Sequence, residues 1–242
     1  MSEYLEPIGQ NFRFVETQID AALELAHRNE GSVKLVVVTK GQSVPKMQAL
    51  IDAGGRFLGE NYPEETVEKI ESLKGIDQVE WHMIGHIQSR KIRFLTRYFN
   101  IIHSVDNLET ARKINMRFTD AGRKVKILLE VNVSGEVSKQ GFDLAEKQNW
   151  QGFIADVNEI ENLTALEIVG LMTMPPLGED AESSRVYFQR CKELLEYVNL
   201  HKRGNQLTEL SMGTSFDYKV AAEEGATIVR VGEAIMGARN YS

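Results

Sequence analysis

Short apolar runs alternate along the chain with longer stretches in which apolar residues recur every three or four positions. The first run, residues 35–39, is too short for a helix and rich in β-branched residues, so it predicts a buried strand. Seven similar runs follow at 56–59, 79–85, 100–105, 125–133, 167–172, 207–212 and 226–231. Helical spacing between the runs predicts helices at 45–53, 64–73, 89–98, 108–122, 180–201 and 216–224, and another at 11–28 before the first strand.

Eight strands that alternate with helices predict a parallel sheet and an α/β fold. In a chain of 242 residues the economical form of such a sheet is a closed (β/α)8 TIM barrel. The alternative is an open doubly wound sheet, which usually has fewer strands, and no Gly-x-Gly-x-x-Gly motif follows the first strand. No Pro/Gly/Ser-rich linker divides the chain, so we expect a single domain over residues 1–242.

Composition narrows the functional classes. The net charge of −7 argues against non-specific binding to nucleic acid or to an anionic membrane surface. The single cysteine, Cys191, excludes an internal disulfide and a cysteine-based zinc site, and the five histidines show no metal-ligand spacing. The acidic amino terminus does not resemble a signal peptide, and no apolar run is long enough to cross a bilayer. These features predict a cytoplasmic protein without a metal site.

Lys40 is the most notable polar residue at a strand end. It directly follows three valines and a threonine, so we expect the aliphatic part of its side chain to lie against an apolar surface that excludes water. Desolvation lowers the pKa of a lysine, and a neutral amine can attack an aldehyde to form an imine. The alternative is a structural lysine paired with a carboxylate such as Glu60. A second loop lysine, Lys139, could also meet an aldehyde.

Two later segments favour a phosphate site. Residues 211–215, Ser-Met-Gly-Thr-Ser, are expected between the seventh strand and its helix, where backbone N–H groups and the helix dipole attract anions. The turn at 230–232 is the neighbouring loop, and barrels commonly hold phosphate after strands seven and eight. Helix capping by Thr214 or Ser215 is the simpler explanation, and it is compatible with phosphate binding. A ligand with both an aldehyde and a phosphate is pyridoxal 5′-phosphate (PLP).

The chain resembles the YggS/PROSC family of pyridoxal phosphate homeostasis proteins. The matching segments run in family order over most of the chain: 38–40 (VTK), 59–62 (GENY), 81–85 (WHMIG), 88–91 (QSRK), 131–133 (VNV), 170–172 (GLM), 210–217 (LSMGTSFD), 229–232 (VRVG) and 237–239 (GAR). Each motif is weak alone, and the ordered set is specific.

The resemblance implies a fold-type III PLP-binding barrel like the N-terminal domain of alanine racemase. It implies that Lys40 forms the Schiff base and that further residues surround the phosphate and ring. These are Asn61, His82, Ser211, Gly213, Thr214, Ser215, Arg230 and Gly232. It also implies a monomeric, non-catalytic carrier or regulator of the PLP pool, with PLP-dependent apo-enzymes as partners. A racemase-like PLP enzyme is the alternative, and His82 is then the candidate second proton carrier beside Lys40.

Overall fold

A closed barrel of eight parallel strands forms the centre of the molecule. The computed structural model describes residues 4–238. The barrel strands are β1 (Lys34–Val38), β2 (Phe57–Glu60), β3 (Glu80–Met83), β4 (Ile101–Val105), β5 (Val125–Asn132), β7 (Leu166–Met172), β8 (Glu209–Thr214) and β9 (Ile228–Val231). β1 pairs with both β2 and β9, and β4 pairs with β5, so the ring has no open edge. This closure confirms the TIM barrel and excludes the doubly wound sheet.

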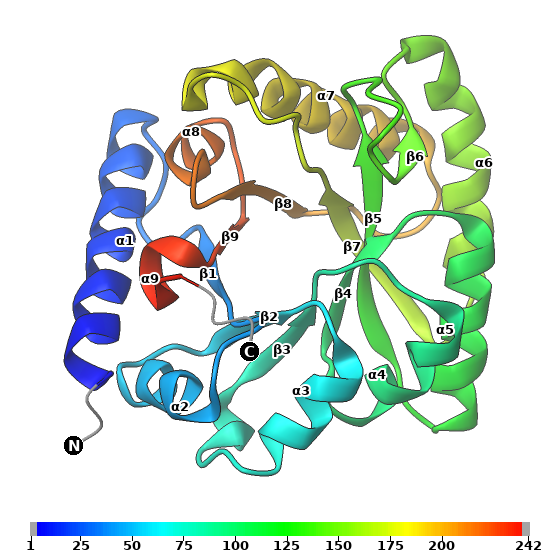
Figure 1. The fold of residues 1–242 in the computed structure, drawn as a ribbon. Helices are drawn as coiled ribbons and strands as arrows, with labels where there is room; N and C mark the ends of the chain where they lie inside the picture. The colour runs from blue at the N-terminus through cyan, green and yellow to red at the C-terminus, as the bar shows by residue number, and fades with distance from the viewer. Residues whose placement is uncertain (1–3, 239–242) are drawn as a thin grey trace.

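Helices surround the barrel, as Figure 1 shows. They are α1 (Leu5–Leu25), α2 (Val44–Asp52), α3 (Pro63–Ile70), α4 (Ile92–Tyr98), α5 (Leu108–Asp120), α6 (Trp150–Glu161), α7 (Arg185–His201), α8 (Tyr218–Glu223) and α9 (Glu233–Met236). Short 3-10 turns occupy Ile76–Gln78, Ser89–Lys91, Lys147–Asn149 and Ala181–Ser184, and the two-residue strand β6 (Phe142–Asp143) pairs with β5 outside the ring. None of the helices between residues 4 and 238 combines the length and apolar character that a membrane crossing needs.

All eight predicted strands are present, and three predictions about the elements need correction. α1 begins at Leu5 rather than at residue 11, because Pro7 lies in the first helical turn, where its missing N–H is not needed. No helix was predicted at α6, which lies between β5 and β7 in chain order and buries Trp150 and Phe153. β8 was expected at 207–212 and instead runs from Glu209 to Thr214, so Gly213 and Thr214 belong to the strand rather than to the following loop.

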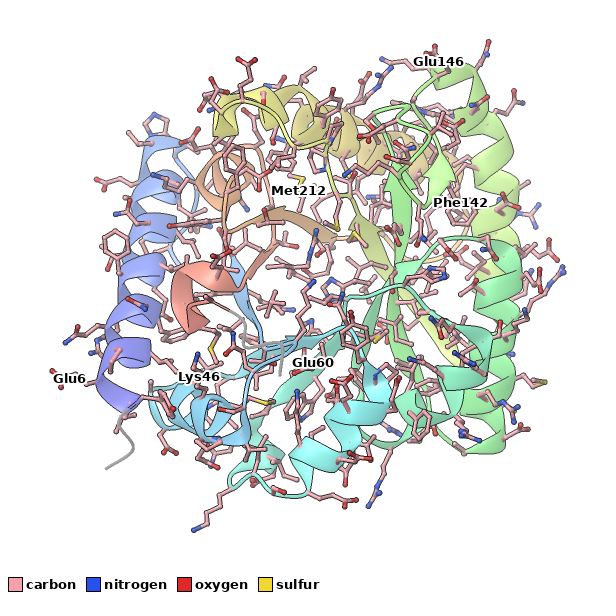
Figure 2. The ribbon with its side chains drawn as sticks, in the orientation of Figure 1. Glu6, Lys46, Glu60, Phe142, Glu146 and Met212 are labelled. Atoms are coloured by element: carbon pink, nitrogen blue, oxygen red, sulfur yellow. The ribbon has the colours of Figure 1, made fainter. Side chains whose placement is uncertain are left out.

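The apolar residues form two separate layers because strand side chains alternate between the two faces of the sheet. The larger cluster lies between the strands and the helices and includes Val37, Leu58 and Met212. The smaller cluster fills the inside of the barrel and consists of Val36, Ile101, Leu128, Met172 and Ile228. Figure 2 shows the side chains on the ribbon, with Met212 of the larger cluster labelled on β8. Polar residues that share the inner face must therefore find their partners within the barrel.

Candidate functional site

A pocket of about 520 Å³ opens at the carboxyl-terminal end of the barrel. Residues that follow β1, β2, β3, β5, β7, β8 and β9 contribute to its wall. Six of the predicted site residues line it: Lys40, Asn61, Thr214, Ser215, Arg230 and Gly232. These residues are separated by up to 192 positions in the sequence, and the barrel brings them to one mouth.

Strand alternation directs Lys40 toward the pocket. Val36 belongs to the inner cluster and Val38 lines the pocket, so Lys40, two positions further, lies on the same side. Glu60 lies on the opposite side of the sheet, next to Leu58 of the outer cluster. There its Oε1 accepts a 2.6 Å hydrogen bond from Thr39 Oγ1. The carboxylate suggested as a partner of Lys40 is therefore bound to Thr39 in the outer layer.

Arg230 is a buried cation in the pocket wall. Its Nη1 donates to Ser211 Oγ at 2.5 Å, and its Nη2 donates to the Thr173 carbonyl oxygen at 3.1 Å. Burial lowers the pKa of the Arg230 guanidinium to about 10, which still leaves the group charged at neutral pH. The two hydrogen bonds hold the plane of the guanidinium in one orientation.

The turn between β8 and α8 is organised by Asp217. Its Oδ1 accepts hydrogen bonds from the backbone N–H of Thr214 at 2.7 Å and from the Thr214 hydroxyl at 3.0 Å. The expected capping by Thr214 or Ser215 is replaced by this contact, and α8 begins at Tyr218 rather than at 216. Ser215 Oγ accepts a hydrogen bond from the backbone N–H of Gly232 at 3.1 Å. The turns after β8 and β9 are therefore joined into one polar surface.

Asn61 presents an unused polar atom. Its Oδ1 is buried and has no hydrogen-bond partner within residues 4–238. Gly85 packs closely against this residue, because a Cβ atom at Gly85 would lie 2.7 Å from the Asn61 Cα atom. A buried acceptor without a donor is costly in a protein interior. Asn61 lines the pocket, whereas its Oδ1 atom is buried and is not open to the pocket in this conformation.

Three predicted site residues, His82, Ser211 and Gly213, do not line the pocket. His82 is fully buried inside the barrel, where its Nδ1 lies 2.8 Å from His103 Nε2. Ser211 lies between Arg230 and His103. Gly213 packs against α8 at φ +92°, a conformation that favours glycine. These residues support the wall from below and do not form its surface.

Glu130 is a charged pocket residue that was not predicted from the sequence. Burial, and next the charge of Asp106, raise its pKa to about 7, while the charge of Arg230 acts in the opposite direction. The sequence does mark this residue, because Glu130 is the single acidic residue in the apolar run 125–133. It lies two positions after Leu128, which faces the inside of the barrel.

A second lysine also reaches the pocket. Lys139 belongs to the loop that follows β5, and it lines the same pocket as Lys40. The loop is held by Asn132, whose Oδ1 accepts from the backbone N–H groups of Ser134 and Gly135 and whose Nδ2 donates to the Glu136 carbonyl. The pocket therefore contains two primary amines that an aldehyde could meet.

Comparisons with known proteins place this geometry in context. The sequence matches the family described as alanine racemase, N-terminal domain, over residues 17–240. It is 37% identical over 225 residues to the pyridoxal phosphate homeostasis protein of Aquifex aeolicus. The aligned region covers 93% of this chain and 95% of that protein. PipY of Synechococcus elongatus, solved with PLP bound, is 30% identical with a TM-score of 0.78, over 90% of this chain and 100% of PipY. Alanine racemase of Bartonella henselae shares the fold at a TM-score of 0.69 and 16% identity, over 97% of this chain and 59% of the racemase.

Proposed function

This chain belongs to the pyridoxal phosphate homeostasis protein family, and from that premise we propose that its barrel binds PLP and releases it without turning over a substrate. The observation that carries the proposal is the composition of one pocket. An amine from the end of β1 and a fixed guanidinium meet there, and the Asn61 side chain lies in the same wall. In this proposal residues 1–242 act as one PLP-binding domain.

The residues present fit the chemical groups of PLP. PLP supplies an aldehyde, and condensation of that aldehyde with a lysine amine gives a Schiff base and releases one water. We assign the amine to Lys40. The polar turns at Ser215 and Gly232 would hold the phosphate, and Arg230 would face the pyridine nitrogen through the N–H groups that Ser211 and Thr173 do not use.

Arg230 also supports the non-catalytic part of the proposal. A guanidinium with a pKa of about 10 donates a hydrogen bond to the ring nitrogen and keeps its own proton. The ring then remains a weak electron sink, which suits storage of the cofactor better than chemistry on a bound amino acid. We propose that the protein is a monomer that buffers the free and bound PLP pool, with PLP-dependent apo-enzymes as recipients.

Substitution of the two pocket lysines tests the assignment. We expect Lys40→Ala to remove the visible absorption of the protein-bound Schiff base, because the amine that forms the bond is gone. Lys139→Ala is the matched control and should retain the absorption. Borohydride reduction of the wild-type holoprotein, followed by peptide mass mapping, should place the label on Lys40.

A full Schiff-base signal in Lys40→Ala at unchanged stoichiometry contradicts the assignment. If the label then maps to Lys139, PLP binding stands and the lysine is wrong. If the purified wild-type protein stays colourless with added PLP, the proposed function itself is wrong.

A further inference from the structure

A line of polar side chains runs through the inside of the barrel, beneath the pocket. Arg230 Nη1 lies 2.5 Å from Ser211 Oγ, and Ser211 Oγ lies 2.8 Å from His103 Nδ1. His103 Nε2 lies 2.8 Å from His82 Nδ1, and His82 Nε2 lies 3.0 Å from Glu80 Oε1. The line crosses from β9 and β8 to β4 and β3. It connects the pocket wall with the first residue of β3, at the amino-terminal end of the barrel.

The surroundings of the line are dry except at its last residue. Arg230, Ser211, His103 and His82 are buried, whereas the Glu80 side chain is 36% exposed. The apolar inner cluster shares this space, and the edge of the Phe57 ring faces His82 with ring centroids 6.0 Å apart. A polar hydrogen that lacks an acceptor in such a place is strongly unfavourable.

The direction of hydrogen donation follows from the arginine. A guanidinium can only donate, so Arg230 donates to the Ser211 hydroxyl. The Ser211 hydrogen then requires an acceptor, and His103 Nδ1 is the one in reach. A neutral histidine that accepts at Nδ1 carries its hydrogen on Nε2, so His103 donates to His82 Nδ1. By the same reasoning His82 carries its hydrogen on Nε2 and directs it toward Glu80.

The pKa shifts of the two histidines agree with this order, and the contact with Glu80 is its weakest step. Burial lowers the pKa of His82 and lowers the pKa of His103 well below the ordinary value, so each ring carries one hydrogen at neutral pH. The His82 Nε2 atom is buried and, within residues 4–238, is not aligned with any acceptor although Glu80 Oε1 is close. The last contact is therefore the loosest in the line.

We propose that His103, His82 and Glu80 are positioning residues that hold Arg230 in its orientation through Ser211: one-directional hydrogen bonds link Arg230, Ser211, His103 and His82, and a 3.0 Å contact joins His82 Nε2 to Glu80. The importance of this hydrogen-bonded line for PLP binding rests on the proposed function, because Arg230 is the residue assigned to the ring nitrogen. The hydrogen-bonded line itself is present in the cofactor-free protein. A change at Glu80, on the end of the barrel opposite to the pocket, therefore reaches the pocket through four contacts.

Nitrogen-15 NMR of the histidine rings in the cofactor-free protein tests the direction of the chain. We expect both His82 and His103 to be neutral, with the hydrogen on Nε2, at pH 7. Peaks are assigned by comparison with His82→Gln and His103→Gln. A hydrogen on Nδ1, or a charged ring, in either residue overturns the proposal, whatever the protein binds.

PLP titration of variants tests whether the chain holds the pocket. His103→Leu removes both polar atoms at similar volume and should weaken PLP binding by about tenfold, because Ser211 loses its acceptor. His103→Gln can accept from Ser211 and donate to His82, so it should stay within about twofold of the wild type. A merely space-filling role for His103 predicts the opposite order, with leucine tolerated at least as well as glutamine.

Glu80→Leu gives a second binding test that does not depend on a buried substitution. We expect PLP binding to weaken by about threefold and the absorption maximum of the bound cofactor to shift, because the last acceptor is removed. Glu167→Leu, at the exposed amino-terminal end of β7, is the matched control and should change neither. If His103→Leu does not fold, this pair decides the question. Wild-type binding and spectrum in Glu80→Leu contradict the coupling.

Discussion

Burial changes the ionisation of individual carboxyl groups in this barrel. Desolvation raises the pKa of Glu60, in the layer between strands and helices, to about 7, and the hydrogen bond from Thr39 acts in the opposite direction. The folded protein therefore holds a proton on Glu60 that the unfolded chain releases above its ordinary value of 4.5. Because Glu60 binds more protons in the folded state in this window, its contribution to the free energy of unfolding falls as the pH rises from about 4.5 to 7.

The substitution Glu60→Gln is expected to remove this dependence. A glutamine amide oxygen can still accept from Thr39 and carries no charge, so it avoids a penalty of up to about 3 kcal/mol at pH 7.5. Chemical denaturation between pH 5 and pH 7.5 measures the effect. The variant should lose less stability over this range than the wild type. Glu68→Gln, on the exposed side of α3, is the control. If the free energy of unfolding changes with pH equally in Glu60→Gln and in this control, Glu60 is already ionised at pH 5.

At the scale of elements, the turn from β8 to α8 depends on close approach as well as on hydrogen bonds. Gly213 has φ +92°, and a Cβ atom there would lie 2.5 Å from the Ala221 Cβ atom and 3.0 Å from the Tyr218 Cα atom. No larger residue can occupy this position without moving α8. The same contact keeps Thr214 and Ser215 at the pocket mouth.

We expect Gly213→Ala to destabilise the protein by roughly 2–4 kcal/mol, because backbone strain and overpacking act together. Gly122→Ala is the matched control. Gly122 also has a positive φ, of +64°, and its Cβ atom would meet open space, so only the strain of about 1 kcal/mol remains. Thermal or urea unfolding distinguishes the two variants. Equal losses would mean that packing against α8 adds nothing.

The elements also differ in how well the sequence predicts them. The strands were predicted correctly because each is a short apolar run that is rich in β-branched residues and bounded by turn residues. This pattern depends only on the local sequence. α6 was missed because its buried residues Trp150 and Phe153 pack against Tyr197 and Phe142, which are distant or preceding partners that the local pattern does not reveal. The end of β8 was misplaced because Gly213 resembles a turn residue, whereas its glycine serves the contact with α8.

The closed barrel decides which side chains share the pocket and thus what the whole molecule can catalyse. A two-base racemase needs a second proton carrier across from Lys40. His82, the sequence-based candidate, lies beneath Arg230 in contact with His103 and does not line the pocket. We therefore expect that holoprotein incubated with L-amino acids in deuterated water leaves the α-proton NMR signals intact.

Alanine racemase incubated with L-alanine provides the positive control for this experiment. Loss of the α-proton signal at the turnover level would show that the protein is an enzyme. Glu130, with its raised pKa of about 7, would then be the first residue to replace by glutamine in search of the proton carrier.

The amino-acid sequence alone determined the number and order of the barrel strands, the lysine after β1 and the small polar residues around the end of β8. These features depend on side-chain period and chemistry over a few neighbouring positions, so they can be read locally. Only the tertiary structure decided which polar residues meet. Closure between β4 and β5 brings Glu80, His82, His103, Ser211 and Arg230 into contact within the barrel. It also places Glu60 and Glu130 in surroundings that raise their pKa values, because burial and partners from distant strands depend on the stagger of the closed sheet.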